Sequence, residues 1–151
     1  MTNEVNELLD TAIYREIASQ AQYIAGQKLT DDPGVQALLK ELAEEELRHC
    51  RRLKNLKDKE VVSRAWHLKK VPDLMISDYL SGGGTLEGAG LQDTLTFAIK
   101  REHESAEFYS RMMGAMRDPN AKRLCQRLAQ EELKHKLKLE ILYDDLFYGE
   151  D

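Results

Sequence analysis

The chain has 151 residues, of which 32% are charged, and a net charge of −5, so it is long enough for one domain with a sizeable core. Acidic and basic residues are interleaved along it, which argues against the clustered basic face that a nucleic-acid surface needs. No apolar run approaches the roughly 20 residues of a membrane span, and the acidic N-terminal stretch lacks a signal-peptide pattern. These features predict a cytoplasmic protein with no membrane or nucleic-acid partner.

The first predicted element is a helical hairpin covering about 3–59. Its first helix has apolar residues at steps of four and three, and Glu16 lies in line with them on this seam. An Asp-Pro pair at 32–33 is typical of an N-cap and a first helical position, so the second helix should begin there. This second helix carries Glu46 and His49 on its own apolar seam. Because the connection is short, the two helices should be antiparallel, with Glu16 and Glu46 facing each other at one height.

The helical periodicity is lost in the next stretch, 60–90. Pro72 and the run Gly82-Gly83-Gly84 should break up any long helix there. No Gly-Lys-Ser/Thr follows the glycines, so we interpret them as part of a linker and not as a phosphate-binding loop. A segment of this length can cross back along a helix roughly 40 Å long. We therefore expect one long crossover, with parallel helices before and after it.

A second hairpin is expected at about 91–145, because this stretch repeats the first hairpin at a constant spacing of 86 positions. The octet LAEEELRH at 42–49 returns as LAQEELKH at 128–135. The register is held without a gap from residue 12 to residue 56, and the copy includes the Asp-Pro pair. A whole helical hairpin, and not only a short motif, has therefore been doubled.

Six polar residues interrupt the four apolar seams at mid-height. They are Glu16, Glu46, His49, Glu102, Glu132 and His135. Seams of this kind close as an all-α four-helix bundle, in one domain over 1–151, which would bury the six side chains in one layer. Buried carboxylates must be paired, coordinated or protonated, and two divalent cations would balance four of them. The pattern therefore predicts a di-metal site.

The donor types narrow the choice of metal. In Glu-x-x-His both side chains lie on one face of the helix, so each hairpin can offer one metal a histidine and a terminal glutamate while its second glutamate bridges. Oxygen and imidazole donors without a thiolate favour iron or manganese over structural zinc. Cys50 and Cys125 form no Cys-x-x-Cys and are expected to be free thiols. Two other interpretations are charged surface helices and a buried, metal-free layer that shares protons.

Over nearly its whole length the chain resembles the rubrerythrin branch of the ferritin-like superfamily. The resemblance is carried by Ala-Ile-x-Arg-Glu and Phe108-Tyr109 in the third helix and by Leu-Ala-x-Glu-Glu-x-x-His in the second and fourth. It implies a ferritin-like bundle with a non-haem di-iron centre. In that centre Glu46 and Glu132 would bridge the irons. Each iron would also have one terminal glutamate, Glu16 or Glu102, and one of the two histidines.

The resemblance also implies an activity. Rubrerythrins reduce hydrogen peroxide with two electrons from the diferrous centre, so the six ligands would also be the catalytic residues. No Cys-x-x-Cys pair is present for a fused rubredoxin domain, so electrons are expected from a separate donor such as rubredoxin. A homodimer fits the same family. Tyr23 and Tyr109 lie two turns beyond a seam glutamate and should either hydrogen-bond the opposing carboxylates, as in the family, or serve as plain core tyrosines.

One position departs from the rubrerythrin pattern. Typical members carry a further glutamate one turn after the first ligand of the third helix, and here that position is Ser105. This keeps open a ferritin-like iron oxidase or iron-handling protein, with O2 as its oxidant. A non-catalytic bundle that binds metal for stability or sensing is a third interpretation. Glu45 and Glu131 fall off the apolar seams and are expected to be solvated or paired with basic residues.

Overall fold

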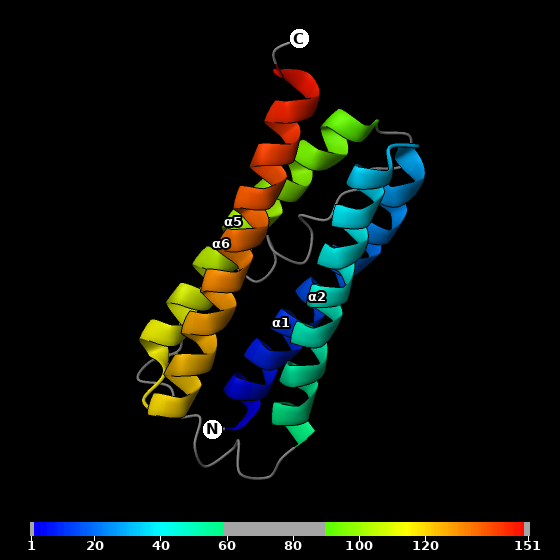
Figure 1. The fold of residues 1–151 in the computed structure, drawn as a ribbon. Coiled ribbons are helices and arrows are strands. Elements are labelled where there is room, and N and C mark those ends of the chain that lie inside the picture. The colour runs from blue at the N-terminus through cyan, green and yellow to red at the C-terminus, as the bar shows by residue number, and fades with distance from the viewer. Residues whose placement is uncertain (1, 59–89, 150–151) are drawn as a thin grey trace.

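The computed structural model describes residues 2–58 and 90–149, and within these residues the chain is helical (Figure 1). The helices are α1 (Thr2–Gly26), η1 (Gln27–Leu29), a short 3-10 helix, α2 (Pro33–Asp58), α5 (Leu91–Ala115) and α6 (Pro119–Phe147). The described residues contain no strand. The predicted all-α four-helix bundle is confirmed.

The four long helices pair as two antiparallel hairpins, α1 with α2 and α5 with α6. In Figure 1, α2 (cyan to teal) and α5 (green to yellow) run in the same direction, so the two hairpins have the predicted relative sense. The expected crossover, 60–90, lies outside the described residues apart from Gly90. None of the described helices is long and apolar enough to cross a membrane.

In both hairpins the second helix begins with the same kind of N-cap, an aspartate. The Asp32 carboxylate accepts the backbone N–H groups of Gly34 at 2.8 Å and Val35 at 3.1 Å. The Asp118 carboxylate accepts the N–H of Ala121 at 2.9 Å. An aspartate in this position satisfies amides that the helix leaves unpaired and typically contributes about 1 kcal/mol to stability. The predicted caps are therefore present in both copies of the repeat.

Two apolar clusters fill the bundle above and below its middle. One contains Leu9, Leu53 and Leu128 together with both cysteines, which are buried free thiols as predicted. The other contains Leu39 and Leu139 and is covered at the end of the bundle by the aromatic residues of the last turns of α6. The layer between the two clusters is polar, and it contains the site described next.

Candidate metal centre

The six residues singled out by the repeat lie together between the two apolar clusters. One glutamate comes from α1, one from α5, and a Glu-x-x-His pair comes from each of α2 and α6. Their exposed fractions are 2% for Glu16, 1% for Glu46, 3% for His49, 1% for Glu102, 0% for Glu132 and 2% for His135. Each helix therefore contributes to one buried polar layer, at the height that the apolar seams predict.

The ligand atoms form two overlapping groups of four, and the atoms of each group lie within 4.8 Å of one another. The first group consists of Glu16, Glu46, His49 and Glu132, and the second of Glu46, Glu102, Glu132 and His135. Glu46 and Glu132 belong to both groups. Each group can hold a metal ion, and the two shared glutamates occupy the positions that bridging ligands would need.

Each histidine points its Nδ1 atom into the layer, toward the shared glutamate of the other hairpin. His49 Nδ1 lies 2.9 Å from Glu132 Oε1, and His135 Nδ1 lies 3.0 Å from Glu46 Oε1. The two imidazole rings are stacked, with their centroids 5.8 Å apart and their planes 9° from parallel. This arrangement directs one nitrogen of each ring inward and leaves the other on the outer edge.

Buried atoms with unused bonding capacity converge on this layer. Within the described part of the chain, the following have no hydrogen-bond partner: Glu16 Oε2, Glu46 Oε1, His49 Nδ1, Glu102 Oε2, both carboxylate oxygens of Glu132, and His135 Nδ1. Buried polar atoms normally have partners, and a buried carboxylate without one is costly. Coordination to cations would give all of these atoms a partner, so the residues fit a metal centre.

In the metal-free chain this layer retains protons. Burial raises the pKa of Glu46 well above its usual range, and the nearby Glu16 and Glu102 raise it further. Burial and the nearby glutamates, Glu102 first, act in the same way on the pKa of Glu132. Burial by itself would lower the pKa of His135, but the carboxylates of Glu102 and Glu46, within 3.5 Å of its Nδ1 atom, raise it to about 11. A metal ion must therefore displace protons when it binds.

The two predicted tyrosines hydrogen-bond the terminal glutamates across the bundle. Tyr109 on α5 donates its hydroxyl proton to Glu16 Oε1 at 2.7 Å, and Tyr23 on α1 donates to Glu102 Oε1. Burial raises the pKa of both tyrosines well above the usual value, and the neighbouring carboxylates raise it further, so the hydroxyls stay protonated. The first of the two expectations for these tyrosines is confirmed. The bonds engage one oxygen of each glutamate and leave Oε2 facing the layer.

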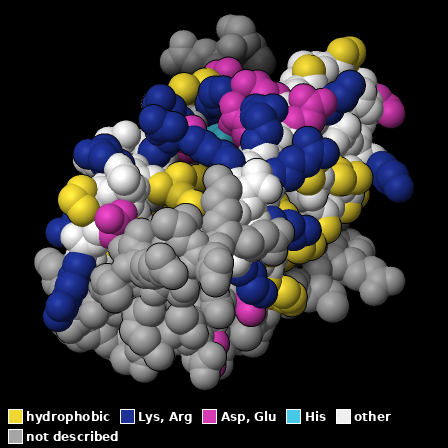
Figure 2. Space-filling model, turned by 90° about the horizontal axis from the view of Figure 1, so that it is seen from below, with side chains coloured by type: hydrophobic (Ala, Val, Ile, Leu, Met, Phe, Trp, Pro, Cys, Tyr) yellow, Lys and Arg dark blue, Asp and Glu magenta, His cyan; other side chains and the backbone are white. Residues whose placement is uncertain are grey.

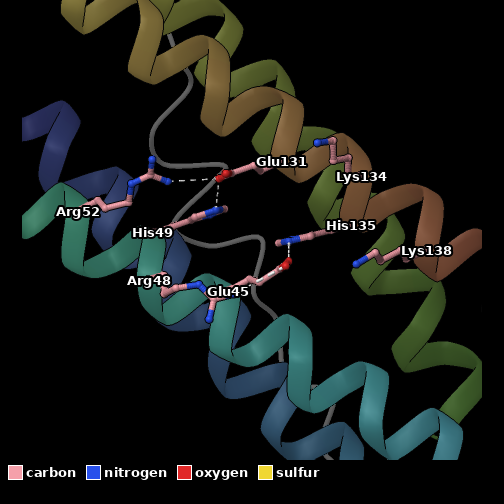
Figure 3. A pocket seen from close by; sticks show the side chains of 8 residues that line it. All are labelled: Glu45, Arg48, His49, Arg52, Glu131, Lys134, His135 and Lys138. Carbon is pink, nitrogen blue, oxygen red and sulfur yellow. Dashed lines mark hydrogen bonds and ion pairs between the residues drawn. The ribbon is translucent and has the colours of Figure 1, made fainter.

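Glu45 and Glu131 have a second role that was not predicted from the sequence. Glu131 Oε2 forms an ion pair with His49 Nε2 at 2.5 Å, and Glu45 Oε2 hydrogen-bonds His135 Nε2 (Figure 3). Their predicted pairing with basic residues is also present, to Arg52 at 3.5 Å and to Arg48 at 3.8 Å. A carboxylate beside the outer nitrogen of each histidine favours a proton on that nitrogen, so Nδ1 can bind a metal once its own proton is displaced. The sequence did contain a sign of this role, because a glutamate directly precedes the predicted bridging ligand in both copies of the repeat.

Ser105 lies buried on α5, one turn after Glu102. Its hydroxyl oxygen accepts a hydrogen bond from Arg15 Nη2 at 2.6 Å, in a buried position. Arg15 and its repeat copy Arg101 are buried between α1 and α5, and each places its guanidinium near a phenylalanine ring. Burial and the neighbouring Arg15 lower the pKa of Arg101. These two buried arginines were not predicted.

A pocket of about 320 Å³ opens between α2 and α6, over the outer edges of the two histidines (Figure 3). Its eight lining residues form four pairs related by the repeat: Glu45 with Glu131, Arg48 with Lys134, His49 with His135, and Arg52 with Lys138. In the space-filling view, a small cyan histidine surface is visible among dark blue and magenta side chains (Figure 2). The pocket therefore brings the outer side of the candidate centre within reach of small molecules.

No protein-family model matches the chain, and its sequence matches no curated protein. A hypothetical protein from Pyrococcus furiosus has a similar solved structure, with a TM-score of 0.72 and 25% sequence identity. The similarity covers 97% of this chain and 92% of the other chain. This likeness supports the helical fold over nearly the whole chain, and the description of that protein assigns it no function.

Proposed function

We propose that this protein is a non-haem di-iron carboxylate protein that reduces hydrogen peroxide with electrons from a separate donor. The observation that carries the proposal is the pair of four-atom groups that share Glu46 and Glu132. Four carboxylates balance the charge of two divalent cations. All-oxygen and imidazole donors suit iron, and manganese fits the same set. Further support comes from the resemblance of these helices to rubrerythrins, and the proposal includes a rubredoxin-type donor and a homodimer.

Reduction of one hydrogen peroxide to two water molecules consumes two electrons and two protons. Two ferrous ions would supply the two electrons when bound, and the donor would restore them. The protein's own residues hold the site in place: Glu45 and Glu131 keep a proton on the outer nitrogen of each histidine, and the tyrosines donate to the terminal glutamates. The pocket over the histidines has ample volume for a molecule as small as hydrogen peroxide.

An iron oxidase is the second candidate, and Ser105 favours it. The position at which rubrerythrins carry a further glutamate holds a hydroxyl bound by Arg15, so the site has six ligand residues. The pocket favours the first candidate, because the described residues that line it include four cationic side chains and two carboxylates. Such a lining repels ferrous ions and does not repel neutral hydrogen peroxide.

The deciding experiment compares two oxidants. Protein loaded anaerobically with two ferrous ions per chain is mixed with hydrogen peroxide or with O2, and the ferric absorbance is followed by stopped flow. We expect peroxide to react at least about tenfold faster, a difference of about 1.4 kcal/mol in the barrier. The Glu132→Ala variant serves as a control and should give no such signal.

Other results would change the assignment. Equal or faster oxidation by O2, with continued uptake of added iron, would replace the peroxidase proposal with the iron oxidase. Slow oxidation by both reagents would indicate a metal site for stability or sensing. Failure to bind either iron or manganese would overturn the di-metal site itself.

A further inference from the structure

The pocket between α2 and α6 has features that the proposed iron chemistry does not use. Its walls carry two cations from each helix: Arg48 and Arg52 from α2, and Lys134 and Lys138 from α6 (Figure 3). The two glutamates that line the pocket, Glu131 and Glu45, contact the Nε2 atoms of His49 and His135. Among the described residues, none with an apolar side chain lines the pocket, so an apolar ligand would gain little from them by entering.

The glutamates only partly balance these cations. Each glutamate is engaged with a histidine, and its ion pair with an arginine is long, 3.8 Å for Arg48 and 3.5 Å for Arg52. Lys138 pairs at 2.9 Å with Glu41, which does not line the pocket. In the described part of the chain, Lys134 has no carboxylate within ion-pair distance. The pocket thus presents guanidinium and ammonium donors whose bonding capacity exceeds that of the acceptors beside them.

We propose that this pocket binds a small multivalent oxyanion, of the size of inorganic phosphate or a short dicarboxylate. A volume of about 320 Å³ is suited to a small ligand. Arginine and lysine are the usual donors to phosphate and carboxylate oxygens. An anion with charge on two sides can contact α2 and α6 at once. It would tie together two helices that pack less closely on each other than the helices within a hairpin do.

The same geometry argues against a cation as the ligand. The carboxylate oxygens that a metal ion would need here are engaged with the histidines, and four positive side chains surround them. The bound anion would cover the outer edges of His49 and His135, and so would lie next to the candidate centre without contacting the inward-facing ligand atoms. The four cationic lining residues belong to neither group of candidate metal ligands, so the inference does not depend on iron being the bound metal.

The test is isothermal titration of the protein with inorganic phosphate and, separately, with succinate, at constant ionic strength set by sodium chloride. Protein as purified and protein stripped of metal are both used. The pocket variant is Arg48→Gln with Lys134→Gln, which removes one cation from each wall. The matched control is Lys40→Gln with Arg127→Gln, because these exposed residues of the same two helices lie outside the pocket.

We expect saturable binding of one anion per chain, with a Kd of about 1 mM or tighter, for at least one of the two probes. The pocket variant should weaken this binding at least about tenfold, and the control should leave it unchanged. Preference for phosphate would identify a tetrahedral oxyanion, and preference for succinate a dicarboxylate. Absence of saturable binding of both probes, or equal weakening by both variants, would overturn the proposal. Neither result bears on the oxidation experiment, which tests the inner layer.

Discussion

Glu131 on α6 lies 2.5 Å from the Nε2 atom of His49 on α2, so a carboxylate of one hairpin orients a candidate ligand of the other. The repeat supplies the same contact in reverse, from Glu45 to His135. The two hairpins are thus joined by these glutamate–histidine contacts as well as by the buried layer of candidate ligands. Partners of this kind hold a metal-binding imidazole in one tautomer and one orientation.

The first prediction concerns this contact. Replacing Glu45 with alanine (Glu45→Ala) should weaken metal binding about 10- to 100-fold, because His135 loses the acceptor that fixes its outer N–H. The fold should be retained, since Glu45 is partly exposed. Competition with a chromophoric chelator measures the affinity. Glu44→Ala, at the exposed neighbouring position, is the matched control and should bind metal like the unchanged protein.

The second prediction separates shared from terminal ligands. Glu46→Ala should remove both metal ions, because Glu46 belongs to both groups of ligand atoms. Glu16→Ala should weaken only one of the two sites, because Glu16 belongs to a single group. Metal content after equilibrium dialysis, measured by mass spectrometry, distinguishes two ions, one and none. Full occupancy of both sites in Glu46→Ala would contradict the bridging role.

The sequence was sufficient for the fold and the inner layer because the repeat supplies two copies of the same evidence. A single Glu-x-x-His on a charged helix is common, but two in register on apolar seams specify which faces meet. The Asp-Pro pairs at 32–33 and 118–119 fixed the start of each second helix. The helix before the second pair was expected to run to about Arg117, and α5 ends two residues earlier, at Ala115.

The outer parts of the site depend on how the helices are rotated against each other, and a seam does not specify that rotation. Glu45 and Glu131 lie beside the apolar seams, so only the approach of α2 to α6 reveals that each reaches a histidine of the other hairpin. Arg15 and Arg101 are likewise of a residue type that is usually found at the protein surface. Their burial follows from the packing between α1 and α5, as does the bond from Arg15 to Ser105.

The third prediction concerns the tyrosine bonds. Tyr109→Phe keeps the buried ring and removes the donor to Glu16 Oε1. The free energy of unfolding should fall by about 1–3 kcal/mol, because a buried carboxylate loses its partner. Both metals should still bind, since Glu16 Oε2 is unaffected. Chemical denaturation measures the change, and Tyr14→Phe, at a position 49% exposed, should leave stability within about 0.5 kcal/mol of the unchanged protein. Loss of metal from Tyr109→Phe would show that the hydroxyl acts on more than Glu16.

The fourth prediction is that the metal-free protein becomes less stable as the pH rises from 6 to 8. The pKa values of Glu46 and Glu132 are raised well above 4.5, so the folded chain favours protons on groups that the unfolded chain has already ionised below pH 6. The pKa of His135 is raised from 6.5 to about 11, so the folded chain keeps a proton that the unfolded chain releases within this range. Each retained proton lowers the free energy of unfolding by up to about 1.4 kcal/mol per pH unit.

Bound metal should reverse this trend, because it displaces those protons and binds more tightly as the competition from protons decreases. Thermal unfolding followed by circular dichroism at pH 6, 7 and 8, with and without metal, measures both trends. Glu46→Gln provides the control, since a neutral amide has no proton to lose and should make the curve of the metal-free protein shallower, while Glu132 and His135 still contribute to its slope. A metal-free Tm that rises between pH 6 and pH 8 would mean that the buried glutamates are already ionised in the folded chain. In that case the conclusion that the metal-free layer retains protons would be wrong, but the distances within the two ligand groups would be unaffected.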